Sequence, residues 1–369
     1  MDKKLFFHIS IVLFSLSIRA QIYNGDLQFK TQQEINNAFK ASGKLHNIKT
    51  INGTLVIGDR STLSNISNLE LFSRIEKIEG GLYLFNNPEL KVLKGLEKIS
   101  ILSELEITGN EGLINFNGFE NLATVKNLCK FSHNKNVVSF EGFDKLKKVG
   151  EFEVFMNKNL KSCKGLENLQ TIVSNLSIID NESLESIAQL KLKSIGNVLS
   201  IKNNYELTSL YGLDKITTLS SIVIAGNNKL KTLEGFKNLR EVSGVLIRGN
   251  SSLISLKGLH NLKNVGDYLD IWLNRSLSSI SELKALEKVG GELHIAENNM
   301  LTTLVGLENL KEIGSISIRD NANLKNYCAL NSFFKRETVK NFSKHFDVKY
   351  NKYNPSFSDL KNSYCVDKK

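Results

Sequence analysis

The sequence predicts a mainly β fold, in which the chain winds into a solenoid of about 12 stacked coils with capped ends. The first observation is an asparagine that recurs every 23 or 24 residues, a period typical of repeat architectures. The second is a set of apolar residues and a glycine at fixed offsets from this asparagine. The third is composition, because 41% hydrophobic residues and only two prolines favour one continuous core without a linker. The recurring asparagines are Asn87, Asn110, Asn134, Asn157, Asn181, Asn204, Asn227, Asn250, Asn274, Asn298 and Asn321.

One frame describes the repeat, with the asparagine as position zero: L-x-I-x-x-N-x-x-L-x-x-L-x-G-L-x-x-L-x-x-I. The apolar pair at minus five and minus three alternates as in a β-strand, so its side chains point inward and those at minus four and minus two point outward. The three-residue spacing after the asparagine suits tight turns, with the glycine at plus eight turning a corner. Strands from successive coils would pair in parallel about 4.8 Å apart, forming one long sheet.

The two ends of the chain depart from this frame. An apolar run at 5–18, preceded by lysines and followed by Ala20, is typical of a cleavable signal peptide and predicts a secreted or cell-surface protein. Thr31 and Glu34 form a capping box for a short helix over about 32–41 that would cover the first coil. No later apolar stretch is long enough to span a bilayer, so no transmembrane segment is expected. The predicted organisation is a signal peptide at 1–20, an N-terminal cap at 21–50, the repeat solenoid at 51–327 and a C-terminal cap at 328–369.

Three parts of the repeat are irregular. Arg60 takes the asparagine position in the first coil. The coil after Asn181 has Gln189 in place of the glycine and Leu192 one place early, so we expect a local bulge there. From about Asn326 the chain abandons the repeat, and several phenylalanines would cover the last coil.

Several runs of the repeat resemble the receptor L domain of the insulin-receptor and epidermal-growth-factor-receptor families. The resemblance covers about residues 50–330 and implies a right-handed β-helix related to leucine-rich repeats. The cysteine-rich modules, membrane span and kinase of those receptors have no counterpart here. The chain is similar instead to exported bacterial proteins that carry such repeats alone, with a closing segment like Cys328-Ala329-Leu330 and a final cysteine. The runs that carry the resemblance are Gly165-Leu166-Glu167-Asn168-Leu169-Gln170-Thr171-Ile172, Leu176-Ser177-Ile178-Ile179-Asp180-Asn181 and Gly306-Leu307-Glu308-Asn309-Leu310-Lys311-Glu312-Ile313.

The four cysteines fall into two groups. Cys328 and Cys365 bracket the C-terminal cap, and in an exported protein a disulfide between them would tie the tail to the last repeat. Cys129 and Cys163 occupy positions that are aliphatic in other coils, so we interpret them as buried free thiols. A second disulfide or a metal pair is the less favoured interpretation, since no Cys-x-x-Cys spacing occurs.

The formal net charge of +10 favours acidic partners such as anionic glycans or lipid head groups. The simpler interpretation is a solvated, lysine-rich exterior, and the scattered positions of the basic residues favour it. Nucleic acid is not an expected partner, because no basic stripe with interleaved aromatic residues is present.

The frame predicts which side chains share the outward face of the sheet. One group holds the only tryptophan, flanked by arginines, as a stacking and hydrogen-bonding surface requires. A second group is apolar, and such outward residues are either a binding surface or are packed against a loop. The first candidate patch contains Arg248, Asp270, Trp272, Leu273, His294 and Arg319, and the second contains Tyr83, Phe85, Phe155, Met156 and Ile179.

Catalytic motifs are absent: the sequence has no Gly-x-Ser-x-Gly elbow, phosphate loop, His-Glu-x-x-His or calcium loop. Glu106 and Glu153 come closest to a paired-carboxylate site, but Lys130 stands between them and favours a cross-strand ion-pair ladder. We therefore expect a non-catalytic recognition or adhesion protein that binds protein or glycan on its sheet face, without a metal or cofactor. The alternatives are a β-helix enzyme acting on polysaccharides and a purely structural envelope protein.

Overall fold

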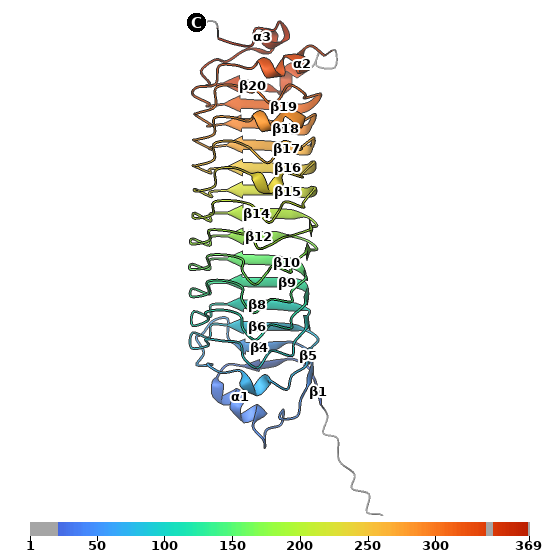
Figure 1. Ribbon diagram of the computed structural model, residues 1–369, viewed down its shortest axis with the longest axis vertical. Helices are drawn as coiled ribbons and strands as arrows, with labels where there is room; N and C mark the ends of the chain where they lie inside the picture. The colour runs from blue at the N-terminus through green and yellow to red at the C-terminus, as the bar shows by residue number, and fades with distance from the viewer. Residues whose placement is uncertain (1–20, 337–341, 368–369) are drawn as a thin grey trace, which may run out of the picture.

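Successive coils of the chain place their strands one above another in a long parallel sheet (Figure 1). The computed structural model describes residues 21–336 and 342–367, so the predicted signal peptide at 1–20 lies outside the described residues. The fold is the predicted mainly β solenoid, with about 11 turns and little helix. Its long sheet is built, in order, from β2 (Leu27–Phe29), β4 (Leu55–Gly58), β6 (Gly81–Phe85), β8 (Glu104–Thr108), β9 (Thr124–Ser132), β10 (Lys148–Phe155), β12 (Leu176–Ile179), β14 (Val198–Lys202), β15 (Thr218–Ala225), β16 (Glu241–Arg248), β17 (Asn264–Trp272), β18 (Lys288–Ala296), β19 (Glu312–Arg319) and β20 (Phe346–Lys349).

Shorter strands pair along the edge next to this sheet. β1 (Ile22–Asn24), β3 (Thr50–Asn52) and β5 (Lys77–Ile78) form a separate three-stranded parallel sheet. β7 (Ile101–Leu102), β11 (Thr171–Ile172) and β13 (Ser194–Ile195) pair farther along the same edge. In the longest strands, such as β15 to β19, the chain runs from this edge into the main sheet without a break.

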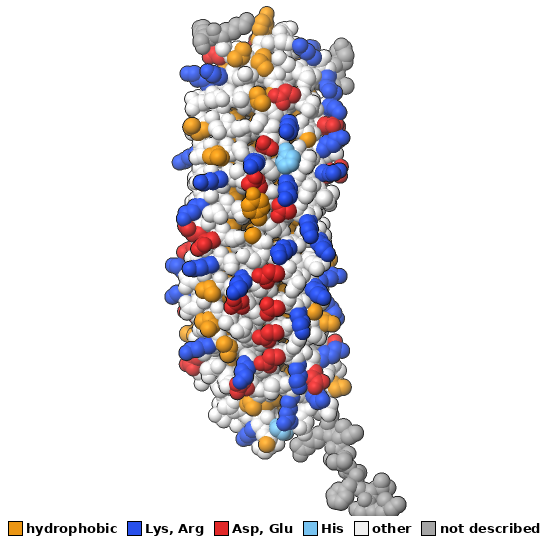
Figure 2. Space-filling model, viewed as in Figure 1, with side chains coloured by type: hydrophobic (Ala, Val, Ile, Leu, Met, Phe, Trp, Pro, Cys, Tyr) orange, Lys and Arg blue, Asp and Glu red, His pale blue; other side chains and the backbone are white. Residues whose placement is uncertain are grey.

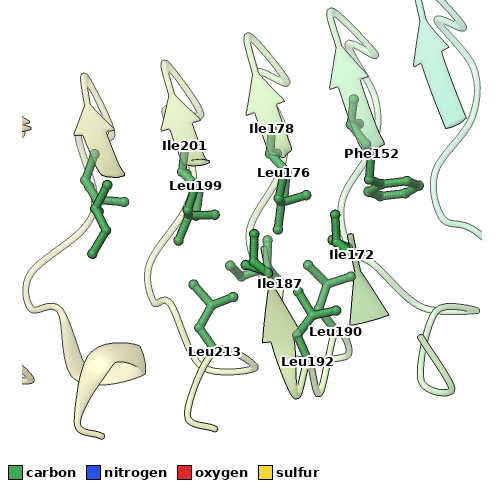
Figure 3. Packing of buried hydrophobic residues seen from close by; sticks show 14 of the residues in the cluster. Phe152, Ile172, Leu176, Ile178, Ile187, Leu190, Leu192, Leu199, Ile201 and Leu213 are labelled. Carbon is green, nitrogen blue, oxygen red and sulfur yellow. The ribbon is translucent and has the colours of Figure 1, made fainter. Parts of the chain in front are cut away.

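The inward positions of the frame form one core that runs the length of the solenoid. Leu176 pairs with Leu199 and Ile178 with Ile201 across neighbouring strands, and all four side chains are buried (Figure 3). The turns contribute the opposite wall of the core, for example Leu190. Because each apolar position lies above its equivalent in the previous coil, the core continues from coil to coil through the stack.

The recurring asparagines are fully or almost fully buried and form a continuous hydrogen-bonded ladder. Asn227 is typical: its amide nitrogen donates to the backbone oxygen of Ile201 at 3.0 Å and to that of Ala225 at 3.2 Å. Its side-chain oxygen accepts from the backbone N–H of Asn204 at 3.2 Å. Eight of the eleven asparagines thus satisfy backbone groups of their own coil and of the coil before it, and Asn87, Asn134 and Asn250 satisfy those of the coil before. A buried turn would otherwise leave these groups unpaired.

The ladder extends beyond the last asparagine of the predicted series. The backbone N–H of Asn321 donates to the side-chain oxygen of Asn351 at 3.0 Å, and that of Asn351 donates to Asn354 at 2.8 Å. The prediction that the chain abandons the repeat from about Asn326 is therefore wrong in part, because β20 adds one more coil. Phe346 and Val348 hold the minus-five and minus-three positions before Asn351, but a step of 30 residues from Asn321 separates them from the regular period.

The first coil closes the other end of the ladder without an asparagine. Arg60 occupies the asparagine position and turns its guanidinium to Glu106, with Nη2 2.7 Å from the carboxylate. The hydroxyl of Ser64 donates instead to the side-chain oxygen of Asn87 at 2.6 Å. A serine of the following turn therefore supplies the hydrogen bond that the arginine cannot make inside the stack.

Helices cover the two ends of the solenoid (Figure 1), and aromatic rings pack beside them. α1 (Gln32–Phe39) begins at the predicted capping box of Thr31 and Glu34, and its side chains at Ile35 and Phe39 are buried. At the other end, α2 (Asn331–Phe334) and α3 (Phe357–Lys361) pack around a cluster of phenylalanine rings. Among the described residues, no helix is both long and apolar enough to cross a bilayer.

The irregular coil after Asn181 leaves the sheet undisturbed. Strand β14 follows β12 with continuous pairing, and Ser194 of β13 pairs with Thr171 in the expected order. Leu190 and Leu192 are both buried, so the one-place shift is absorbed in the turn. The predicted bulge therefore does not reach these strands, because a turn can change its length more easily than a hydrogen-bonded ladder can change register.

The cysteines have the arrangement that the sequence favours. Cys328 and Cys365 form a disulfide, and the backbone N–H of Tyr327 donates to the oxygen of Cys365 at 2.8 Å beside it. Cys129 and Cys163 are free and buried. Burial raises the pKa of the Cys163 thiol to about 12, and burial likewise raises the pKa of Cys129.

Removal of one ladder asparagine tests the role of the ladder. We expect Asn227→Ala to lower the free energy of unfolding by about 3 kcal/mol, because it leaves several buried backbone groups without partners. Asn228→Ala, one residue along and exposed, is the matched control and should change it by no more than about 0.5 kcal/mol. Urea unfolding followed by circular dichroism measures both, and equal effects of the two substitutions would contradict a structural ladder.

Thiol labelling tests the buried cysteines. A thiol whose pKa is raised is protonated at neutral pH, and a buried thiol is also out of reach of reagents. We expect iodoacetamide to leave Cys129 and Cys163 unmodified in the folded protein at pH 8 and to modify both in 6 M guanidinium. Mass spectrometry gives the count, and labelling of either thiol without unfolding would show that its coil opens.

Candidate ligand-binding face of the sheet

The first candidate patch lies on the C-terminal half of the sheet, across β16, β17 and β18. Strand pairing places Arg248 beside Trp272 and Trp272 beside Ala296 in one row. In the neighbouring row it places Asp270 beside His294. These side chains point outward because the residues between them on each strand, such as Ile271, are the buried apolar pair of the frame.

The guanidinium of Arg248 lies over the indole of Trp272 at cation–π distance, with Cζ 3.8 Å from the ring centroid. Arg248 is exposed and Trp272 is half-buried. The stack holds the long arginine side chain in place while its N–H groups still face solvent. An arginine restrained in this way loses less conformational entropy when it binds a partner.

Asp270 and His294 form a pair beside this stack. The Nδ1 atom of His294 lies 2.8 Å from Oδ1 of Asp270, and the side chains are 24% and 23% exposed. The pair therefore presents polar atoms to solvent from fixed positions. A carboxylate and an imidazole next to an arginine and an indole give this surface donors, acceptors and an apolar ring within three adjacent strands.

Arg319 does not belong to this group. Ala296, which is buried, lies between Trp272 and Arg319 in their row. Arg319 instead donates from Nη2 to Asp347 of β20 at 2.7 Å. The prediction that arginines flank the tryptophan on both sides is therefore wrong on one side.

Leu273 lies in the turn after β17 and not in an outward strand row. Its φ of +59° is in the left-handed region, as is that of Met156 at +52° in the second patch. Both precede a ladder asparagine, and many other coils have a left-handed residue at this position, including Gly226 and Asp180. The asparagine ladder imposes this conformation, so the strain of a leucine there is structural rather than a sign of a site.

Two residues of this half of the sheet escaped prediction from the sequence. Tyr268 lies two positions before Asp270, and its ring crosses Gly244, where an added Cβ would be 2.5 Å from the ring. Its hydroxyl reaches the hydroxyl of Ser221 at 3.2 Å. Asp347 was not predicted because strand β20 was not predicted, although Asp347 holds the minus-four position before Asn351. The outward positions of a strand continue to minus six from the asparagine. Tyr268 holds this position before Asn274, and the neighbouring strand has Gly244 there, which leaves room for the ring.

The second candidate patch is two separate clusters. Strand pairing places Thr108 and Ser132 in the row between Phe85 and Phe155, and their hydroxyls are 2.8 Å apart. Phe155 and Ile179 are neighbours in the same row. Met156, beside them, is 48% exposed. The five residues thus do not form one apolar surface.

Tyr83 and Phe85 are held by polar neighbours. The Tyr83 hydroxyl donates to Glu104 at 2.5 Å, and burial together with this carboxylate raises the pKa of Tyr83 to about 12. The ring of Phe85 is buried, and the guanidinium of Arg60 lies over it at 4.2 Å. The outward position of Phe85 is therefore explained by packing beneath Arg60, and the Phe85 ring is not available to bind a ligand.

The candidate carboxylates lie on either side of Lys130, as the frame predicts. Glu106 is buried and paired with Arg60, and Lys130 Nζ lies 3.5 Å from its other oxygen. Burial, followed by the charge of Glu151, raises the pKa of Glu153. Within residues 21–336 and 342–367, no group of three or more His, Cys, Asp or Glu side chains is arranged to hold a metal ion.

Fold and surface together define a parallel β solenoid with one exposed sheet face. A scan against protein-family models finds no match for this chain, and a search of curated proteins finds no similar protein. The arguments for its function therefore come from its own side chains.

The single tryptophan allows the Arg248 stack to be tested directly. We expect Arg248→Ala to shift the Trp272 emission maximum to longer wavelength and to raise acrylamide quenching, because the substitution uncovers the indole. The free energy of unfolding should fall by no more than about 1 kcal/mol. Arg319→Ala, on the same face but paired with Asp347, is the control and should leave the emission unchanged. Identical spectra for both variants would contradict the stack.

Proposed function

We propose that this protein is a non-catalytic recognition protein that binds a macromolecular ligand on the C-terminal half of its sheet face. The observation that carries the proposal is the stack of Arg248 on Trp272 beside the Asp270–His294 pair. Tryptophan and arginine dominate the energetics of protein interfaces, especially where polar neighbours surround them.

This arrangement favours a protein ligand over a glycan. A sugar ring binds an aromatic side chain by stacking on an open ring face, and Arg248 covers one face of the Trp272 indole. An oriented guanidinium can instead donate two parallel hydrogen bonds to a carboxylate or to backbone carbonyl groups of a protein. Asp270 and His294 add an acceptor and a donor within the same area.

The place of action that fits this proposal is outside the cell or at its surface. The signal peptide predicted at 1–20 and the resemblance to receptor L domains both support it, and a disulfide between Cys328 and Cys365 is typical of oxidising compartments. The same resemblance supports recognition by the solenoid as a whole, although fold alone does not determine function.

Two other functions make different demands on the same face. An enzyme acting on polysaccharides would use Glu106 and Glu153, but Arg60 and Lys130 neutralise Glu106. The raised pKa of Glu153 is the one property that suits a general acid. A purely structural envelope protein would need no ordered arginine on a tryptophan.

Binding assays with paired substitutions test the proposal. The protein from residue 21 onward is screened against arrays of cell-surface proteins and of glycans, and bound ligands are measured by calorimetry. We expect the variant Arg248→Ala/Trp272→Ala to lose at least about tenfold in affinity for a ligand of this face. The matched control is Phe155→Ala/Ile179→Ala, which alters the same face three strands or more away and should retain binding.

Several results would overturn the proposal. Undiminished binding by the folded Arg248→Ala/Trp272→Ala variant would exclude this surface. Cleavage of an acidic polysaccharide that is lost in Glu153→Gln would establish the enzyme. The absence of any saturable ligand would favour the structural role.

A further inference from the structure

A second surface lies on the edge where each coil turns toward the main sheet. Two rows of residues, all exposed except the half-buried Gln170, run along this edge over five consecutive coils, and the leucines and isoleucine between the rows are buried. Backbone hydrogen bonds fix the second row: the N–H of Gln170 donates to Lys147 at 3.0 Å and that of Lys193 to Gln170 at 2.8 Å. The first row is Lys145, Asn168, Lys191, Lys215 and Asn238, and the second is Lys147, Gln170, Lys193, Thr217 and Arg240.

No acidic residue interrupts either row. We call these ten residues the basic edge. The irregular coil after Asn181 contributes to it: the pairing of Ser194 with Thr171 places Lys193 in the second row, and Lys191 is the one residue between the buried Leu190 and Leu192, where other coils have two. In the unshifted frame these lysines would be one position away from the rows of their neighbours. The shift therefore changes which side chains this coil exposes, as well as how its turn packs.

The cations of the basic edge have no carboxylate partner among the described residues, whereas those beyond its ends do. Lys147, Lys191, Lys193, Lys215 and Arg240 make no ion pair with any described residue, and all are exposed. Outside the basic edge, the cations on the same side of the solenoid pair with neighbouring carboxylates: Lys98 with Glu76, Lys263 with Glu287 and Lys311 with Glu287. Unneutralised charge is therefore concentrated in the middle of this edge.

Carboxylates border the basic edge on one side at Asp144, Glu167 and Asp214, and the same row continues into the two preceding coils with Glu120 and Glu97. Four of the five accept a hydrogen bond from the N–H of the glycine two residues earlier, as Glu120 does from Gly118 at 2.8 Å. Figure 2 shows acidic side chains one above another along the middle of the lower half of the molecule, with lysine and arginine side chains along its sides. An anionic ligand would be kept off this row and aligned along the solenoid axis.

We propose that the basic edge binds a linear acidic polysaccharide lying along the solenoid axis. Coils stack about 4.8 Å apart, so the cations of the second row, on alternate coils, are about 10 Å apart and the five coils span about 19 Å. A polymer with a charge on every second sugar would meet one cation at each charge. Asn168, Gln170 and Thr217 lie between the cations and offer hydrogen bonds to hydroxyl groups.

The composition of the edge favours a polysaccharide over a nucleic acid. Proteins that bind single-stranded nucleic acid combine cations with aromatic side chains on which bases stack. The ten residues of the basic edge include no aromatic side chain. Double-stranded DNA carries about one charge per 1.7 Å of its axis, far denser than this spacing of cations.

The experiment measures binding of hyaluronate, which carries one carboxylate on every second sugar, and of a sulfated polysaccharide to the protein from residue 21 onward, by calorimetry at 50 and 200 mM salt. We expect saturable binding that weakens with salt, and a loss of about tenfold or more in Lys147→Gln/Lys193→Gln/Lys215→Gln. The matched control is Lys91→Gln/Lys161→Gln/Lys231→Gln, which removes the same charge from exposed lysines that also lack ion pairs but lie elsewhere on the solenoid. The control should change the affinity less than about twofold.

The outcomes separate this proposal from that for the sheet face. The Arg248→Ala/Trp272→Ala variant should bind the polysaccharides as the unsubstituted protein does, whichever result it gives with a protein ligand. Equal losses in the two lysine variants would show non-specific attraction by net charge and overturn the basic edge. Tighter binding of single-stranded DNA than of either polysaccharide, or no binding of either, would also overturn it.

Discussion

The asparagine ladder is the interaction on which the rest of this structure depends. Each side chain joins the backbone of two coils inside the core, where unpaired N–H and C=O groups would be costly. The ladder also requires a left-handed residue before many of its asparagines, even where that residue is Leu273 or Met156. Because these contacts fix where each strand ends, neighbouring strands pair in register and outward side chains form straight rows.

The sequence predicts the parts of the fold that burial and local hydrogen bonding determine. The apolar pair at minus five and minus three is buried in coil after coil, since an inward strand position tolerates little else. The capping box of α1 and the buried free thiols follow from equally local rules. In contrast, β20 was missed because the 30-residue step to Asn351 breaks the period, although Phe346, Val348 and Asn351 satisfy the frame.

The candidate site was less predictable, because the frame assigns a row to each residue but does not determine where a long side chain turns. Arg248 turns to Trp272, whereas Arg319 turns to Asp347, and both hold the same position of the frame. Phe85 has the outward position of a binding residue but is buried under Arg60. These outcomes depend on neighbours from other coils, including a strand that the period does not reveal.

The two surfaces differ in how their charge can act. On the sheet face, Arg319 and Arg60 are neutralised by Asp347 and Glu106, so attraction there falls off over short distances and contacts such as the Arg248 stack must supply specificity. On the basic edge the cations are unpaired among the described residues, and their fields add along the rows. Such an edge can hold a charged polymer loosely while the sheet face remains open. Both surfaces are compatible with one scaffold because outward substitutions leave the ladder and the core unchanged.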